Sequence, residues 1–142
     1  MLALPLALCL MAQPLLADPS TVAGRVPEVD VQQPTGNSLE DGHTKVGCGT
    51  VVIGKSGTAK KFKIRNIGNA PLTGITVTRN GPNAREFRVV QATKTSVEAG
   101  SSSTFTVTFK PLVKGLRSAA IHIKSNDADE GSFDIILTGK GQ

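Results

Sequence analysis

The feature that most constrains the fold is a strict alternation of apolar and polar residues over short stretches. In "STFTVTF" (103–109) the phenylalanines and valine alternate with Thr, and in "KKFKIR" (60–65) Phe62 and Ile64 alternate with basic residues. A period of two places successive side chains on opposite faces of an extended chain, so both stretches are predicted as half-buried strands. No window of the sequence carries the i, i+3, i+4, i+7 apolar stripe of an amphipathic helix.

Further segments of the same kind are separated by clusters of Gly, Asn, Pro and Ser, which favour turns. They are residues 28–33, 50–53, 74–78, 86–90, 118–124 and 132–137. A chain of 142 residues has room for one domain whose core needs no disulfide or metal. Seven or eight short strands, with turns about every ten residues, are typical of a two-sheet sandwich. The sequence therefore predicts an all-β, immunoglobulin-like antiparallel β-sandwich.

The same alternation predicts which side chains are buried. The predicted core contains Phe105, Val107, Phe109, Phe62, Ile64, Ile121 and Ile123. All five phenylalanines fall at inward positions, and the chain has no tryptophan or tyrosine. Because no aromatic ring is then left on the surface, there is no platform on which sugars or bases could stack. This disfavours a carbohydrate-binding or single-strand nucleic-acid-binding module.

A P-loop pattern, G-x-x-x-x-G-K-[ST], occurs in "GTVVIGKS" (49–56), with Lys55 at the basic position. A working P-loop needs a preceding strand and a following helix, because backbone N–H groups and the helix N-terminus hold the phosphates. Here the intervening residues 50–53 are a β-branched run that prefers an extended strand, and the chain after Gly57 alternates as another strand. We interpret Gly54 and Gly57 as turn residues between two strands and expect no nucleotide binding.

The first segment, "MLALPLALCLMAQPLLA" (1–17), is uncharged, rich in Leu and Ala, and too short to span a bilayer, which is typical of a signal-peptide core. It has no basic n-region, and Leu15 stands where a small residue is usual. We predict a signal peptide at 1–17, a linker at 18–26 and one domain at 27–142. The expected location is secreted, cell-surface or periplasmic, with no transmembrane span.

Charge is distributed unevenly along the chain, whose net charge is +5. Residues 18–48 contain five acids and two bases, whereas residues 49–142 contain fourteen bases and six acids. On one predicted strand Lys61, Lys63 and Arg65 point to a single face and form a candidate polyanion-binding stripe. Lysines on an outward face also guard a sheet against edge pairing, so a purely structural role is the alternative.

Other candidates for chemistry are weaker. The acid cluster from Asp127 to Asp134 lacks EF-hand spacing and is interpreted as a solvated hairpin loop. His43 and His122 are far apart in sequence, without the Cys/His spacing of a zinc site. Cys48, the one cysteine outside the leader, is interpreted as a small buried or half-exposed side chain. No G-x-S-x-G motif occurs, so we expect no catalytic serine. With the other candidates interpreted as structural, we expect no catalytic residue, no metal site and no cofactor.

Three motifs occur in order: an N-x-G-N-A-P-L turn (66–72), an F-T-V-T-F-K-P strand (105–111) and a final S-N-D…L-T-G-x-G hairpin (125–141). Over residues 27–142 the chain resembles the bacterial choice-of-anchor D domain, which is akin to the ASH group that includes ASPM and Hydin. The resemblance implies a non-catalytic immunoglobulin-like sandwich. It also implies a secreted or surface protein in which the domain often stands in tandem ahead of a sorting signal. Where the family usually has an aromatic or acidic residue and then F-G, this chain has V-G-C-G (46–49), so one core side chain is smaller.

The leading hypothesis is a non-catalytic structural or adhesive module of an exported bacterial protein, stacked with copies of itself. The ends of the sandwich would then be the contact sites, and "LTGKGQ" (137–142), with Gly139 and Gly141 as a short hinge, would lead into the next copy. One alternative is a module that binds acidic polymers through the basic stripe. Another is a cytoplasmic scaffold domain like the eukaryotic relatives, which requires that 1–17 are not a signal. The expected partners are neighbouring domains or other surface proteins, with weak binding of acidic polysaccharide, while nucleic acid is not expected.

Overall fold

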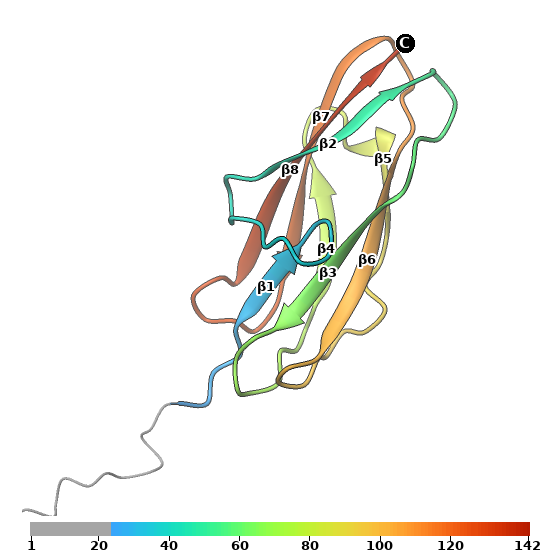
Figure 1. The fold of residues 1–142 in the computed structure, drawn as a ribbon. Helices are drawn as coiled ribbons and strands as arrows, with labels where there is room; N and C mark the ends of the chain where they lie inside the picture. The colour runs from blue at the N-terminus through green and yellow to red at the C-terminus, as the bar shows by residue number, and fades with distance from the viewer. Residues whose placement is uncertain (1–23) are drawn as a thin grey trace, which may run out of the picture.

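The structure is a computed structural model that describes residues 24–142, and it contains eight strands in two sheets (Figure 1). The strands are β1 (Val29–Gln32), β2 (Lys45–Val51), β3 (Lys60–Asn66), β4 (Thr76–Asn80), β5 (Phe87–Val90), β6 (Ser102–Phe109), β7 (Gly115–Lys124) and β8 (Ser132–Gly141). A short 3₁₀ helix, η3 (Ala84–Glu86), precedes β5. The prediction of seven or eight short strands is confirmed.

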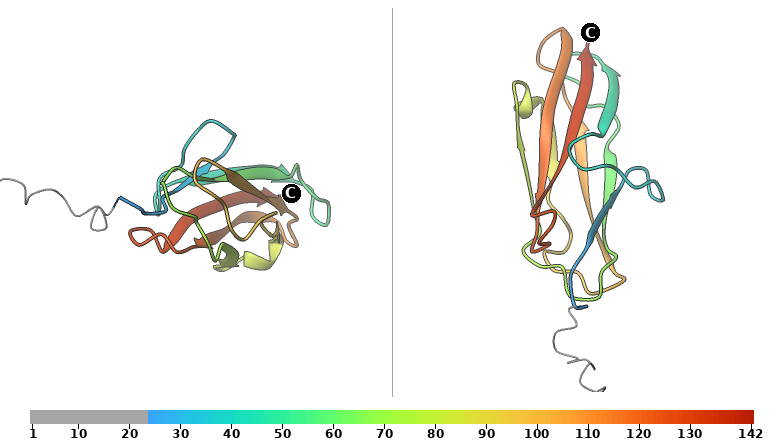
Figure 2. Two further views of the ribbon diagram at one scale, coloured as in Figure 1. Left: turned by 90° about the horizontal axis from the view of Figure 1, so that it is seen from below. Right: turned by 90° about the vertical axis from the view of Figure 1, so that its left-hand side faces the viewer.

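The two sheets pack face to face, as the two further views of Figure 2 show. The first sheet has the order β1-β3-β6-β5, and the second has the order β2-β8-β7-β4. Within the first sheet all neighbours are antiparallel, and the register places Phe62 of β3 opposite Phe105 of β6. Every second residue of these strands then points to the core, as the alternation requires. The predicted immunoglobulin-like β-sandwich is confirmed.

The core between the sheets contains the predicted side chains. Phe62, Ile64, Phe105, Val107, Phe109, Ile121 and Ile123 are each at most 1% exposed. The rings of Phe62 and Phe105 stack with 4.8 Å between their centroids, and those of Phe87 and Phe109 stack at the same distance. Phe133 is also buried, so the inward assignment of all five phenylalanines is confirmed. A register slip of one residue would have buried the threonines of β6 instead.

One pair of strands departs from the antiparallel prediction, because β2 runs parallel to β8. The strand also begins earlier than expected, and it buries Val46 and Cys48. Gly49 has a φ of 78°, and the β2–β8 register shifts between Gly47 and Thr50. A glycine in the left-handed region permits this irregularity, which the sequence pattern of a regular strand does not reveal.

The β-branched run 50–53, predicted as a strand, continues the strand only to Val51. Val52 and Ile53 lie in the turn that follows β2 and are 51% and 41% exposed. In this turn Gly54 has a φ of 80°, and Lys55 donates its N–H to the carbonyl of Val52 over 2.9 Å. The turn conformation thus overrides the strand preference of the run. The chain then enters β3 rather than a helix, which confirms Gly54 as a turn residue.

The predicted hinge at Gly139 and Gly141 is wrong. Both glycines are buried in β8, where they pair with Arg117 and Gly115 of β7. A Cβ on Gly139 would lie 2.5–2.8 Å from ring atoms of Phe109. Glycine is therefore used here for close packing between the sheets and not for flexibility.

The loops gather at the two ends of the sandwich, and the described chain enters at one end and leaves at the other (Figure 1). The turn after β2, η3, the segment between β6 and β7, and the end of β8 lie at the end where the chain leaves. The entry segment 24–28 and the loops 67–75, 91–101 and 125–131 lie at the opposite end.

No helix within residues 24–142 is long and apolar enough to cross a membrane. The predicted signal peptide 1–17 and most of the predicted linker 18–26 lie outside the described residues.

Candidate interaction surfaces

Exposed apolar side chains are concentrated at the end of the sandwich where the described chain leaves. Among residues 24–142 eight large apolar side chains are exposed, and five of them belong to this end. We call these five the apolar end: Val52, Ile53, Leu112, Val113 and Leu116. Leu116 is 83% exposed, the largest fraction of the eight. Single exposed apolar residues are ordinary, but a group of them at one place is typical of an interaction surface.

Backbone hydrogen bonds hold the two segments of the apolar end together. Ile53 donates its N–H to the carbonyl of Gln142 over 2.9 Å, and Gly54 donates to the carbonyl of Pro111 over 2.9 Å. Gly141 packs so closely on Pro111 that a Cβ at this position would lie 2.9 Å from the proline side chain. The surface is therefore held in place by paired backbone on both sides.

A buried carboxylate organises the segment that carries Leu112. Glu86, the last residue of η3, is 4% exposed, and its Oε1 accepts the N–H of Leu112. Its Oε2 lies 3.7 Å from Nε of Arg117, and Arg117 donates from Nη2 to the carbonyl of Lys114 over 2.9 Å. The sequence prediction places Glu86 in a strand and gives it no role. The signal available was an isolated acid among many bases.

A pocket of about 270 Å³ lies beside this ion pair. Pro82, Leu112 and Val113 form its apolar side, and Arg85, Arg117 and the buried Glu86 form its charged side. Nε of Arg117 is buried and has no hydrogen-bond partner among the residues the structure describes. Because Glu86 offsets the charge of Arg117, the pocket combines apolar walls with the cation of Arg85, a chemistry that suits an apolar side chain next to a carboxylate.

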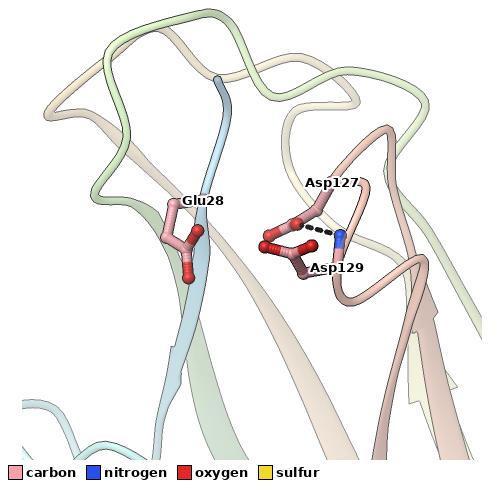
Figure 3. Close-up of side chains that lie close together, drawn as sticks. All are labelled: Glu28, Asp127 and Asp129. Atoms are coloured by element: carbon pink, nitrogen blue, oxygen red, sulfur yellow. Dashed lines mark hydrogen bonds between the residues drawn. The ribbon is translucent and has the colours of Figure 1, made fainter. Parts of the chain in front are cut away.

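The opposite end of the sandwich carries acidic side chains. Carboxylate oxygens of Glu28, Asp127 and Asp129 lie within 4.8 Å of one another, and Figure 3 shows them between β1 and the 125–131 loop. Burial and the nearby negative charges, that of Asp127 first, raise the pKa of Glu130. We call Glu28, Asp127, Asp129 and Glu130 the acidic end.

The interpretation of this region as a solvated loop is wrong for Asp127, which is only 4% exposed. Its Oδ2 accepts the N–H of Val29 over 2.8 Å, and its Oδ1 accepts the N–H groups of Asp129 and Glu130 over 3.0 and 3.3 Å. Because backbone donors use both oxygens, Asp127 ties the 125–131 loop to β1. The cluster is explained by this structural role, and we infer no metal site from it.

The predicted basic stripe lies on the outer face of the first sheet, where the inward Phe62 alternates with it. Lys61 is exposed, while Lys63 and Arg65 are half-buried. Nη1 of Arg65 lies 3.7 Å from Oδ2 of Asp30 on the neighbouring strand β1. At this distance and with the arginine partly in solvent, the pair adds little stability, but it offsets part of the positive charge at that edge.

Two further bases, which the sequence prediction missed, lie on the same face. Arg88 of β5 is opposite Thr108 of β6, and these residues line a pocket of about 330 Å³ together with Lys110 and Ser56. The alternation of β5 around the buried Phe87 was the signal that Arg88 points outward. We call the enlarged set the basic face: Lys61, Lys63, Arg65, Arg88 and Lys110.

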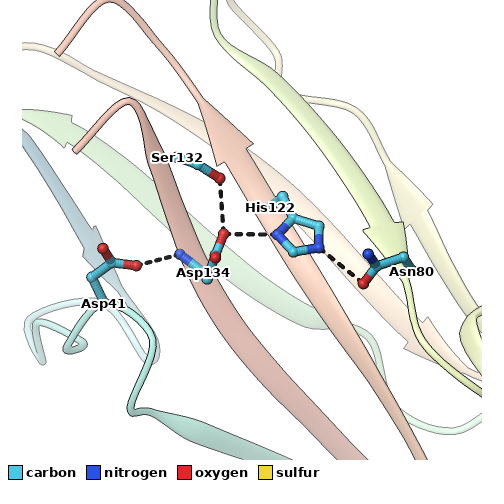
Figure 4. A network of polar contacts seen from close by, with 5 residues as sticks. All are labelled: Asp41, Asn80, His122, Ser132 and Asp134. Carbon is cyan, nitrogen blue, oxygen red and sulfur yellow. Dashed lines mark hydrogen bonds and ion pairs between the residues drawn. The ribbon is translucent and has the colours of Figure 1, made fainter. Parts of the chain in front are cut away.

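A polar network crosses the outer face of the second sheet (Figure 4). Nδ1 of His122 lies 2.7 Å from Oδ1 of Asp134, and Nε2 lies 2.9 Å from Oδ1 of Asn80. Ser132 donates to the same Asp134 oxygen, and Asp41 accepts the N–H of Asp134. Burial alone would raise the pKa of Asp134, but hydrogen bonds from His122 and Ser132 outweigh it and lower that pKa. Because the Ser132 hydroxyl bonds the carboxylate and not the imidazole, the network is not a nucleophile–base–acid relay.

The remaining candidates have ordinary structural places. Cys48 is a free, buried thiol whose pKa is raised by burial, against a smaller lowering by Lys60. The interpretation of Cys48 as a small buried side chain is confirmed. Nδ1 of His43 lies 2.8 Å from the carbonyl of Asp41. Within residues 24–142 neither histidine belongs to a cluster of metal-ligating side chains.

Two packed sheets, a shared core and functional candidates confined to the surface define the class of the protein, an immunoglobulin-like β-sandwich module. Residues 40–133 match the family described as "Abnormal spindle-like microcephaly-assoc'd, ASPM-SPD-2-Hydin", so the chain belongs to the ASH family. The family consists of non-catalytic modules, and such domains generally mediate protein interactions. A search of curated proteins found no match.

Solved structures with the same fold come from bacteria and from humans. A protein of unknown function from Porphyromonas gingivalis W83 is 21% identical with a TM-score of 0.63, and the match covers 91% of this chain and 51% of that protein. The ASH / PapD-like domain 7 of human CEP192 is 12% identical with a TM-score of 0.59, and 97% of each chain is covered. The secreted serine protease VesC from Vibrio cholerae is 14% identical with a TM-score of 0.53, over 79% of this chain and 23% of the protease. At these identities the likeness concerns the fold.

Proposed function

We propose that the protein is a structural or adhesive module of an exported bacterial protein, of the choice-of-anchor D type, that contacts other protein domains through the apolar end. The observation that carries this proposal is the grouping of five exposed apolar side chains on the two backbone-paired segments of that end. Burial of such side chains against a partner is favourable because it removes apolar surface from water.

Export is supported by the composition of residues 1–17, which are uncharged and rich in leucine. The rival location is the cytoplasm, where the protein would act as a scaffold domain. Sequencing the N-terminus of the mature protein separates the two, because an exported protein loses residues 1–17 and a cytoplasmic scaffold keeps them.

Photo-crosslinking in the native cell tests the contact surface. A benzophenone amino acid in place of Leu116 is expected to give a discrete cross-linked protein adduct, because this side chain is the most exposed of the apolar end. The matched control carries the same probe in place of Thr78, which is exposed on the outer face of the second sheet, and is expected to give none. Adducts from the control position without adducts from position 116 would contradict the proposal.

Binding of acidic polymers is a second candidate function, favoured by one observation. The structure adds Arg88 and Lys110, which share a pocket, to the basic residues of β3 on the same sheet face. Bases spaced along neighbouring strands can follow a flexible polyanion without an aromatic platform.

Heparin chromatography tests this candidate. We expect the triple change Lys61→Ser, Lys63→Ser and Arg65→Ser to shorten retention at low salt, and Arg88→Ser with Lys110→Ser to shorten it further. All retention is expected to vanish near 1 M salt, where the screening length is only about 3 Å. Folding of both variants, and any self-association of the triple variant, should equal those of the wild type. Heparin binding that survives high salt would contradict the view that this face binds polymers only weakly. Self-association that is lost in the triple variant would show that the face takes part in protein contacts.

A further inference from the structure

We infer that the partner of the apolar end is the acidic end of a second copy of this domain, so that copies associate head to tail. The inference rests on the proposed function and adds the identity of the partner. It is carried by the opposite charges of the two ends and by the exposed apolar side chains that each end presents.

The charges of the two ends are complementary. The segments of the apolar end, 52–59, 81–86, 110–117 and 140–142, contain six bases and one acid, the buried Glu86, which pairs with Arg117 and leaves a net charge of +5. The segments of the opposite end, 24–28, 67–75, 91–101 and 125–131, contain five acids, of which Asp127 is buried, and two bases, which leaves a net charge of −3. Facing charges of opposite sign steer association and select the correct partner and orientation.

The acidic end also offers apolar contact. Val26 and Ile67 are 51% and 53% exposed, and they account for two of the three exposed large apolar side chains that lie outside the apolar end. The Val26 N–H donates to Oδ1 of Asn69, and the Ile67 N–H donates to the main-chain carbonyl of Glu28 over 2.8 Å. These bonds attach Val26 and Ile67 to the backbone that carries Glu28, and an apolar side chain together with a carboxylate is the chemistry that suits the pocket where Leu112 and Val113 lie beside Arg85.

Charge also argues against association of two identical ends. Two apolar ends face to face would bring Lys55, Lys114 and Arg85 of one copy against the same bases of the other, and two acidic ends would oppose their carboxylates. Like charges in contact are unfavourable, so a heterologous contact between different ends is preferred over a two-fold symmetric one.

Pairing through the exposed edge of β4 is opposed by the structure. Gln91 uses its side-chain amide to bond both main-chain groups of Val77, accepting its N–H over 3.3 Å and donating to its carbonyl over 2.8 Å. These groups are therefore occupied, and a strand from another molecule would have to displace Gln91.

Sedimentation of two complementary variants tests the inference. Leu112→Ser with Leu116→Ser disables the apolar end, and Asp129→Lys with Glu130→Lys disables the acidic end without touching Asp127. The wild type is expected to form species that grow beyond the dimer with concentration, because a head-to-tail contact leaves a free end on each side. Each variant alone should be monomeric, with a dissociation constant raised about tenfold or more, equivalent to about 1.4 kcal/mol.

An equimolar mixture of the two variants is the decisive sample. Each variant keeps one intact end, so the mixture should form a heterodimer with the wild-type dissociation constant and stop there. The matched control, Thr78→Ser with Thr76→Ser on the outer face of the second sheet, should associate like the wild type.

Each other outcome has a distinct meaning. Self-association of the acidic-end variant alone would show that like ends meet, which overturns the head-to-tail inference and leaves the apolar end as the contact surface. A wild type that stays monomeric up to about 1 mM, where binding is worth only about 4 kcal/mol, would overturn the inference, while photo-crosslinking at position 116 still tests the proposed function. Self-association of the apolar-end variant would overturn both.

Discussion

Phe109→Ala is expected to lower the free energy of unfolding by about 3–5 kcal/mol, as for other fully buried aromatic side chains. Phe109 is 1% exposed, and its ring stacks on Phe87 with 4.8 Å between centroids. The same ring fills the space left by the missing side chain of Gly139 on the other sheet. Truncation therefore removes contacts across both layers of the sandwich, and chemical denaturation monitored by circular dichroism measures the loss.

Two controls make this prediction specific. Thr106→Ala, on the outer face of the same strand, should cost less than about 1 kcal/mol because no buried contact is lost. Gly139→Ala should cost about 1–3 kcal/mol by overpacking against the ring, and less in a Phe109→Leu background, where the facing side chain is smaller. Equal costs at positions 106 and 109 would mean that the packing described for β6 is incorrect.

The strands and the core of this protein could be predicted from the sequence because they depend on a local pattern. Alternation in β3 and β6 identifies the inward residues whatever their partner strand is, and a buried face on each strand then leaves a sandwich as the simplest arrangement. The parallel pairing of β2 with β8 could not be predicted in this way, because it depends on which distant strand occupies the neighbouring position.

The sequence predictions for Val52, Ile53 and Gly139 are wrong because the fold overrides the local preference of each residue. Val52 and Ile53 are β-branched residues that prefer a strand, but the turn at Gly54 removes them from the sheet and exposes them. Gly139 is interpreted as part of a hinge because glycine is flexible, but the ring of Phe109 requires a residue without Cβ at that position. In each case a tertiary contact or a single backbone conformation outweighs local preference.

The candidate surfaces differ in the same way, since the sequence reveals a surface formed by one strand but not a surface formed by separate segments. The stripe of Lys61, Lys63 and Arg65 is visible in the sequence because it belongs to one strand. The apolar end is not visible, because Ile53 and Leu112 come from separate segments that only the fold brings together. The burial of a polar residue also could not be predicted, since residue type alone does not distinguish a buried, hydrogen-bonded carboxylate from a solvated one.

Asn66 is the clearest case of such a buried polar residue, and Asn66→Ala is expected to cost about 3 kcal/mol or more. The side chain is fully buried, and its Oδ1 accepts the N–H groups of Gly68 and Glu28 over 3.0 and 3.3 Å. Its Nδ2 donates to the carbonyls of Ala70 and Val97 over 2.7 and 3.0 Å. Alanine removes the partner of the Gly68 and Glu28 N–H groups and of the Ala70 carbonyl, whereas the Val97 carbonyl keeps the Leu72 N–H, and an unsatisfied buried group costs about 1–3 kcal/mol. Thermal and chemical denaturation measure the change.

Asn66→Asp separates the donor role of this side chain from its acceptor role. The carboxylate can still accept from Gly68, but it faces the carbonyl oxygens of Ala70 and Val97 without a proton to donate. Burial and these oxygens favour the protonated acid, so its pKa in the folded protein should lie above its unfolded value. The variant should therefore gain stability relative to wild type as pH falls through that raised pKa, and lose it as pH rises. The difference is read at each pH from paired denaturation curves. A stability difference that stays constant between pH 4 and 8 would show that the two donated hydrogen bonds do not hold the turn between β3 and β4.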